Sequence, residues 1–218
     1  MQAPIVVINP NSTQAVTDGM SAAVDSLRRP GGPEVECITM EGGPPGVETQ
    51  MDVESVVLPL CEYVRGRNHD AGAFVIGCYS DPGLHAAREV ARAPVFGIAE
   101  SAMATALTRG DRFGVISILP GSIPRHLRQV RAMGLESRLA GDLPVGLGVT
   151  ELGGGEAGIY ERMETAGRRL RDECGADVVI LGCTGMAHFR GPLEEALGLP
   201  VVEPTRAAVT LALGAVTA

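Results

Sequence analysis

The sequence predicts an α/β protein with two similar lobes, each built on a parallel β-sheet, and with a ligand cleft between them. Three observations lead to this fold: the length of 218 residues, the alternation of short strands with longer helices, and an internal repeat. A chain of this length forms either one large domain or two small ones. The repeat decides in favour of two lobes.

Short runs rich in β-branched residues alternate with longer segments of helical periodicity. The predicted strands are 5–8, 73–76, 113–118 and 178–181, and the predicted helices are 14–28, 52–65, 84–92 and 157–173. Ser12 or Thr13 gives a start signal for the first helix, and Asp81-Pro82 gives one for the third. Such alternation is typical of parallel sheets covered by helices.

The internal repeat consists of three pairs of matching segments, in the same order and at a nearly constant offset. VVINPNS (6–12) matches GVISILPGS (114–122), AGAFVIGC (71–78) matches GADVVILGC (175–183), and PVFGIAESA (94–102) matches PVVEPTRAA (200–208). A duplicated architecture explains three matches in register better than chance does. We therefore predict an N-terminal lobe, 1–108, and a C-terminal lobe, 109–218. The final helix, 206–218, can pack on its own lobe or cross back to the first, and the sequence leaves this open.

Composition limits the partners. The net charge of −8, with Arg residues interspersed among acids, opposes binding to nucleic acid. No apolar run approaches the roughly 20 residues that span a bilayer, and the start of the chain lacks a basic leader. We expect a cytoplasmic protein that binds a small molecule, without a membrane partner. The chain contains no Lys, so pyridoxal phosphate cannot be held as a Schiff base, and the chemistry is expected to run without that cofactor.

Two of the five cysteines carry the functional prediction. Cys78 and Cys183 each follow a strand and a Gly, and the repeat makes them equivalent. Ligands of open parallel sheets bind at the carboxyl ends of the strands, so two facing lobes would place one thiol on each side of a ligand. Inversion of a stereocentre requires a base on one face and an acid on the other. The sequence therefore predicts a racemase or epimerase with Cys78 and Cys183 as the acid and base.

The other three cysteines are expected to be small buried hydrophobic residues, because the chain has no CxxC motif and an odd number of thiols: Cys37, Cys61 and Cys174. Asn9 and Asn11 flank a Pro at a strand end and are predicted to contact the substrate. Asp81 is interpreted as a helix cap that could also orient Cys78. Glu100 and Glu203 follow the last paired strands, where they could face the cleft or only begin helices.

No metal site is expected. His85, His126 and His188 are isolated in sequence and lack ligand spacing, so surface or packing roles are predicted for them. The segment ELGGGEAG (151–158) is predicted to be a loop, and its glycine spacing does not fit a phosphate-binding fingerprint.

Five segments together resemble the aspartate/glutamate racemase superfamily, and within it the hydantoin and allantoin racemases. They are INPNST (8–13), GPPGVET (43–49), CYSDPGLHAARE (78–89), PVFGIAESA (94–102) and GCTGM (182–186). The resemblance implies two Rossmann-like, flavodoxin-like lobes, no cofactor, a homo-oligomer, and the two cysteines as general acid and base. It also implies that substrate-binding residues lie around the thiols and in the first turn: Asn11, Ser12, Thr13, Tyr79, Ser80, Thr184 and Gly185.

Departures from the family pattern bear on the substrate. Thr49 stands where hydantoin racemases usually have a Gly associated with the ring-substrate pocket, and Thr184 resembles the amino-acid racemases of the superfamily. A hydantoin is the stronger carbon acid, and the predicted cleft motifs contain no Arg to pair with a substrate carboxylate. A 5-substituted hydantoin or an allantoin-like cyclic ureide is therefore the expected substrate. The alternatives are racemisation of aspartate or glutamate, a related isomerase or decarboxylase reaction, and a two-lobed binding protein without turnover.

Overall fold

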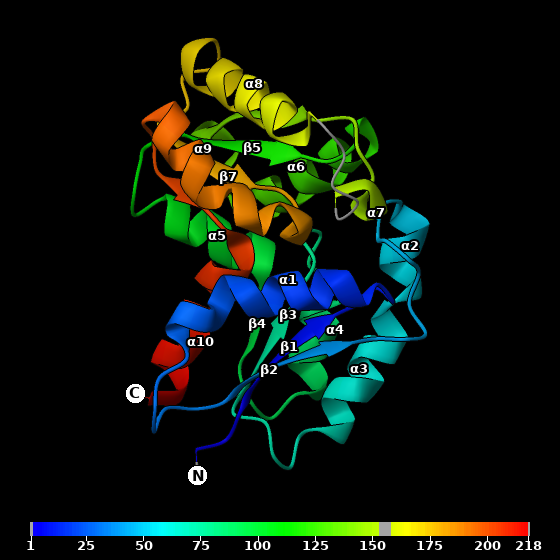
Figure 1. Ribbon diagram of the computed structural model, residues 1–218. Helices are drawn as coiled ribbons and strands as arrows, with labels where there is room; N and C mark the ends of the chain where they lie inside the picture. The colour runs from blue at the N-terminus through cyan, green and yellow to red at the C-terminus, as the bar shows by residue number, and fades with distance from the viewer. Residues whose placement is uncertain (1, 153–157, 218) are drawn as a thin grey trace.

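A computed structural model describes residues 2–152 and 158–217, and Figure 1 shows that they form two lobes, one above the other. The predicted loop 151–158 lies mostly outside the described residues. The first lobe contains β1 (Ile5–Asn9), α1 (Gln14–Val24), β2 (Val35–Thr39), α2 (Gln50–Ser55), α3 (Val57–Gly66), β3 (Ala73–Ile76), α4 (Leu84–Val90) and β4 (Val95–Gly97). The chain continues through α5 (Ile98–Ala106), β5 (Phe113–Ser117), α6 (Ile123–Ala132), β6 (Leu139–Pro144), α7 (Val149–Leu152), α8 (Ile159–Asp172), β7 (Val178–Leu181), α9 (Arg190–Leu197), β8 (Val201–Val202) and α10 (Pro204–Thr217). Short 3₁₀ helices are η1 (Asp25–Leu27), η2 (Pro120–Ser122), η3 (Glu136–Arg138) and η4 (Thr184–Phe189).

The two sheets have the same topology. Their strand orders are β2-β1-β3-β4 and β6-β5-β7-β8, and every neighbouring pair is parallel. In register, Ile5 lies opposite Ala73 in the first sheet, and Phe113 lies opposite Val178 in the second. Each lobe is therefore a doubly wound α/β unit of the flavodoxin-like order, and the predicted fold class is confirmed.

Helices cover both faces of the first sheet, which explains why all five residues of β1 are buried. Ile5 and Val7 face one layer, which contains α1 and α10, and Val6 and Ile8 face the other, which contains α3 and α4. Alternate residues of one strand thus enter two separate cores. Because no face of the strand meets water, the segment shows a continuous apolar run rather than an alternating pattern.

The last helix of each half packs on the sheet of the other half. Helix α5 follows β4 of the first sheet but contacts β7 and β8 of the second, and α10 follows β8 but contacts β1, β3 and β4. The two helices also pack against one another, and Figure 1 shows α10 running down into the first lobe. The sequence boundary at 108 falls at the end of α5, so the packing units exchange one helix each across that boundary.

Buried carboxylates cap both exchanged helices at equivalent positions. Asp81 accepts hydrogen bonds from the backbone N–H groups of Ala99 at 3.0 Å and Glu100 at 2.8 Å, where α5 begins. Glu203 accepts from Thr205 at 3.0 Å and from Arg206, where α10 begins. These acceptors satisfy N–H groups that have no partner within the helix and oppose its positive end. The predicted cap at Asp81 therefore exists, but it caps α5 rather than the helix that follows it.

Gly97 makes room for the Asp81 carboxylate. Gly97 and Glu203 occupy equivalent positions, two residues after the paired strand residues Val95 and Val201. A Cβ atom on Gly97 would lie 2.3 Å from the carboxyl carbon of Asp81. In the second lobe the capping acid comes from the strand end itself, and in the first it comes from the loop after Cys78. Absence of a side chain at residue 97 is therefore a condition for this cap.

The predicted strands all form, with β1 one residue longer and β5 one residue shorter than expected. The segment predicted as one helix at 52–65 forms two. Helix α2 ends at Ser55 and α3 begins at Val57, with Val56 between them. Within the described residues, the structure contains no helix that is both long and apolar enough to cross a bilayer.

Substitution of Gly97 with Ala tests the contact between β4 and Asp81. The added methyl group would force the buried carboxylate away from its two N–H donors, so we expect a loss of about 1–3 kcal/mol in the free energy of unfolding. Gly214→Ala is the matched control, because residue 214 lies in α10 with no atom within 4 Å of a Cβ, and we expect it to gain about 0.5–1 kcal/mol. Urea unfolding measures both. Equal stability of the two variants would contradict the role of Gly97.

Candidate active site

Cys78 and Cys183 line one cavity between the two lobes. The cavity has a volume of about 30 Å³, and its wall is formed by the loops that follow β1, β2, β3, β5 and β7, together with α6 and the start of α7. Its lining residues are Asn11, Val47, Gly77, Cys78, Tyr79, Ser80, Ile118, Ser122, Arg125, His126, Val149, Gly182, Cys183 and Thr184. Six of the predicted site residues are therefore brought together: both cysteines, Asn11, Tyr79, Ser80 and Thr184.

A glycine precedes each thiol because the neighbouring strand passes too close for a side chain. The N–H of Gly77 donates to the carbonyl of Ile8 at 2.8 Å, and that of Gly182 donates to Ile116 at 2.7 Å. A Cβ on Gly77 would lie 2.9 Å from the Ile8 oxygen, and one on Gly182 would lie 2.7 Å from the Ile116 oxygen. The Gly-Cys pair thus places both sulfurs at the same point of the two sheets.

Burial dominates the ionisation of the two thiols. Cys183 is buried and Cys78 half-buried, and desolvation raises the pKa of both. The backbone N–H of Ser80 lowers the pKa of Cys78, and that of Gly185, with the Thr184 hydroxyl, lowers the pKa of Cys183. The two backbone donors sit two residues after each cysteine, and all three donors offset the desolvation only in part.

The thiols differ in their charged neighbours. Cys183 and Asp81 raise the pKa of Cys78 and Arg125 lowers it, whereas the Glu48 carboxylate raises the pKa of Cys183. A cation stabilises a thiolate and an anion opposes it, so the two halves of the site are equivalent in geometry but not in charge.

Asn9 shapes the first turn rather than the cavity wall. Its amide nitrogen donates to Asn11 Oδ1 and to Thr17 Oγ1, both at 3.0 Å, and its side chain is fully buried. Asn11 Oδ1 also accepts from the N–H of Thr13 at 3.0 Å, so the two amides lock the turn. Of the two asparagines, only Asn11 reaches the cavity.

Four further residues predicted from the resemblance lie outside the cavity. Ser12 donates its N–H to the carbonyl of Pro44 at 3.0 Å. Thr49 is exposed and is the N-cap of α2, where it forms a reciprocal capping box with Asp52. Thr13, with Gly185, lines a second pocket that adjoins the first. The structure therefore gives Ser12 and Thr49 roles in the turn and the helix start.

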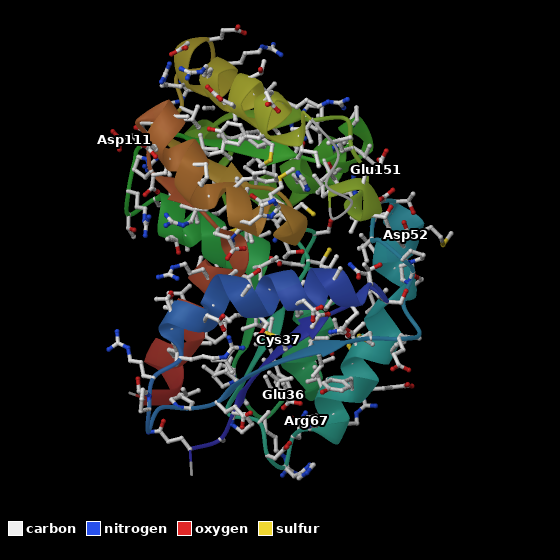
Figure 2. All side chains as sticks on the ribbon, in the orientation of Figure 1. Glu36, Cys37, Asp52, Arg67, Asp111 and Glu151 are labelled. Atoms are coloured by element: carbon white, nitrogen blue, oxygen red, sulfur yellow. The ribbon has the colours of Figure 1, made fainter. Side chains whose placement is uncertain are left out.

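The segment around Thr49 joins the lobes. The Glu48 carbonyl accepts a hydrogen bond from Arg125 at 2.7 Å, and its carboxylate accepts from the N–H of Val149 at 2.7 Å. Figure 2 shows Asp52 of the first lobe and Glu151 of the second on the same side of the molecule. It also shows that the Arg67–Glu36 ion pair, 2.9 Å long, lies apart from both, on the first lobe. These two hydrogen bonds thus join the lobes beside the cavity.

The comparisons agree with this geometry. The family model described as Asp/Glu/Hydantoin racemase matches residues 5–212. The chain belongs to this family. It is 37% identical over 211 residues to the hydantoin racemase of Pseudomonas sp. (strain NS671), covering 95% of this chain and 84% of that protein.

Two solved structures extend the comparison. An allantoin racemase from Klebsiella pneumoniae has a TM-score of 0.93 at 32% identity, covering 99% of this chain and 88% of that one. A glutamate racemase from Bacillus anthracis has a TM-score of 0.70 at 17% identity, covering 96% and 79%, and shares the fold. The protein is therefore an isomerase of the racemase type, and the predicted enzyme class and family are confirmed.

Sequence reasoning missed two residues of the racemase site, both on α6. Arg125 and His126 line the cavity, so the cavity wall contains an Arg from outside the predicted cleft motifs, and the buried His126 packs at that wall. Neither belongs to a repeated motif, because α6 lies outside the three matched segments. The signal that could have found them is their place shortly after the repeated strand end 114–122, whose loop faces the same cleft.

His126 is held by a buried carboxylate. Its Nδ1 lies 2.7 Å from Asp142 Oδ2, and both side chains are 5% exposed. The Tyr79 ring stands edge-on to the imidazole, with centroids 4.9 Å apart. These contacts fix the ring at the cavity wall, next to the loop that carries Cys78. Among the described residues, no group of three His, Cys, Asp or Glu side chains is placed to hold a metal ion.

A larger apolar pocket adjoins the cavity and shares Val149 and Thr184 with it. Its volume is about 860 Å³, and it lies between α1 and the segments α7, α8 and η4 of the second lobe. Ala15, Val16 and Leu152 contribute to its apolar wall. The racemase thus has a small chamber lined by the thiols and a wide apolar space beside it.

Substitution of Asp81 with Asn tests the buried cap beside Cys78. Burial raises the pKa of Asp81 to about 6, despite its two N–H donors and Gln129. Because the folded-state pKa lies above the unfolded one, the folded chain retains a proton between pH 4 and 6 that the unfolded chain loses. Stability is therefore lost as pH rises through that window, by about 3 kcal/mol for this group.

We expect the free energy of unfolding of the Asp81→Asn variant to fall less than that of the wild type between pH 4 and 7. Urea unfolding at several pH values measures the difference, and Glu203 contributes equally to both proteins. Parallel pH profiles would show that Asp81 does not titrate in this range.

Proposed function

We propose that this racemase inverts the carbon next to a carbonyl group in a 5-substituted hydantoin or a related cyclic ureide, using Cys78 and Cys183 as its two bases and no cofactor. One observation carries the proposal: two thiols from equivalent strand ends of the two lobes line a single cavity. A substrate between the lobes would present opposite faces to the two sulfurs. That arrangement fits a two-base proton transfer.

The proposed reaction moves one proton off the substrate and another onto it. The thiolate of one cysteine takes the proton from the stereocentre, the electron pair of the C–H bond forms a C=C bond, and the carbonyl π pair moves onto oxygen. The thiol of the other cysteine then delivers its proton to the opposite face of the resulting enolate. The enzyme ends with the charge exchanged between its two sulfurs, ready for the reverse reaction.

Backbone donors at both thiols support this chemistry. The N–H groups of Ser80 and Gly185 favour the ionised sulfurs and can also stabilise negative charge on an enolate oxygen. The cavity of about 30 Å³ is smaller than a substituted ring, so side chains or lobes must move apart before a substrate can enter. Closure around the substrate would then exclude water from the enolate.

The adjoining pocket favours hydantoins with apolar substituents. It opens beside Cys183 and Thr184, its wall is largely apolar, and its volume of about 860 Å³ accommodates an aromatic side chain. An allantoin-like substrate would place a polar ureido group there. The identity of 37% to a hydantoin racemase supports the same choice.

Racemisation of aspartate or glutamate is the second candidate, and Arg125 in the cavity wall favours it. A substrate carboxylate commonly pairs with Arg, and this cation removes the sequence-based reason against acidic substrates. Among the described residues that line the apolar pocket there is no Arg for the other carboxylate of such a substrate, and burial lowers the pKa of His188 there.

Replacement of each of the two cysteines with Ala tests the mechanism. We expect Cys78→Ala and Cys183→Ala each to lower racemisation of 5-benzylhydantoin at least about 100-fold, because each removes the acid or base on one face. Cys174→Ala is the control, since Cys174 is half-buried and lies outside the cavity lining. Polarimetry in deuterated water, with label uptake by NMR and an enzyme-free blank, measures both inversion and exchange.

The same assay, run on both enantiomers of 5-benzylhydantoin, allantoin, aspartate and glutamate, tests the substrate. Inversion with deuterium uptake for the hydantoin, and less for the others, is the expected result. Exchange with none of the four would overturn the substrate assignment, and wild-type inversion by either cysteine variant would overturn the two-thiol mechanism.

A further inference from the structure

Arg125 is a partly buried cation that forms no ion pair with a carboxylate of residues 2–152 or 158–217. Its Nη1 donates to the carbonyl of Gly121 at 3.0 Å and its Nη2 to that of Glu48 at 2.7 Å. Its Nε is buried and has no hydrogen-bond partner among the described residues. None of the ion pairs formed by those residues includes Arg125.

Such a guanidinium needs a negative charge nearby. Carbonyl oxygens satisfy donors but do not neutralise the charge, and burial of an uncompensated cation is costly. Burial lowers the pKa of Arg125, and the largest opposing effect comes from Cys78, ahead of Asp52. The anion that this cation lacks can therefore form at Cys78, in the wall of the same cavity.

The charged surroundings of the two sulfurs differ by one cation. Arg125 and His126 of α6, Asp81 of its own loop and Cys183 are the charged or titratable groups around Cys78. Around Cys183 they are Cys78 and Glu48, and the Glu48 carboxylate is fixed by the N–H of Val149. An anion thus stands beside each thiol, Asp81 beside Cys78 and Glu48 beside Cys183, and the cation Arg125 acts on Cys78.

We propose that Arg125 is the counter-ion of the Cys78 thiolate and a positioning residue for the reaction, which holds the negative charge whenever Cys78 is the ionised member of the pair. This inference rests on the proposed pairing of the two thiols. During proton abstraction the charge passes from sulfur to the substrate oxygen within one small cavity, and a fixed cation at the wall stabilises both states. Arg125 makes the symmetric fold electrostatically unequal.

Loss of Arg125 has a defined effect on kcat/KM for the two enantiomers. A racemisation has no free-energy difference between its two sides, so kcat/KM is equal for the two enantiomers in any variant. Loss of Arg125 therefore cannot favour one direction in kcat/KM. It lowers kcat/KM equally for both enantiomers, so these rates cannot show why activity is lost. The pH at which Cys78 ionises shows it directly.

Alkylation without substrate tests the proposal. Iodoacetamide reacts with the thiolate, so its rate of reaction with Cys78 reports how much of that thiol is ionised. Peptide mass spectrometry measures this rate as a function of pH in a Cys183→Ala background. The midpoint of the pH profile is taken relative to the alkaline plateau of the same variant. We expect Arg125→Gln to move that midpoint upward by about one pH unit, a tenfold slower reaction near neutral pH. Arg125→Lys, which keeps the charge, should restore most of the shift.

The matched control probes Cys183 in a Cys78→Ala background, where Arg125→Gln should leave the midpoint unchanged. An unchanged midpoint at Cys78, or equal shifts at both thiols, would overturn the proposal. So would a raised KM for acidic substrates with unaltered alkylation, because Arg125 would then bind a substrate carboxylate. Since no substrate is present in the alkylation, this result stands apart from failure of the substrate assignment.

Discussion

The exchange of α5 and α10 between the two sheets is the constraint on which the rest of the structure depends. Each helix starts at the end of one sheet and packs on the other, so neither half can bury its sheet alone. Buried carboxylates, Asp81 and Glu203, hold the N-termini of these helices. Because the helices cross, the carboxyl ends of the two sheets are brought together, and both Gly-Cys turns reach one cavity.

This arrangement sets two requirements of the site against one another. Proton transfer to and from a carbon acid benefits from a dry cavity, because charges interact more strongly where water is excluded. The same burial raises the pKa of Cys78 and Cys183 and works against the thiolate that one of them must provide. Backbone N–H groups offset this at both sulfurs, and the guanidinium of Arg125 does so at one. The fold therefore supplies backbone donors at both thiols and the cation Arg125 at only one of them.

Much of the fold followed from the sequence because its signals are local. The strand limits follow from short apolar runs between turn residues, and the two-lobed arrangement follows from the repeat. The split at Val56 was missed because residues 52–65 keep one apolar periodicity across the break. The cap of α5 was assigned to the wrong helix, because Asp81 reaches a backbone eighteen residues away in sequence, and only packing decides which helix end it meets.

The sequence by itself determined the pair of thiols, because Gly77-Cys78 and Gly182-Cys183 are one backbone environment written twice, and close strand contacts require the glycine in each. It also determined the family and the class of reaction. Only the tertiary structure decided the charge around those thiols. Arg125 and His126 stand on a helix outside the repeated motifs, and Glu48 comes from a segment that joins the lobes. Electrostatic energies depend on distance in space and on burial, which residue order does not record.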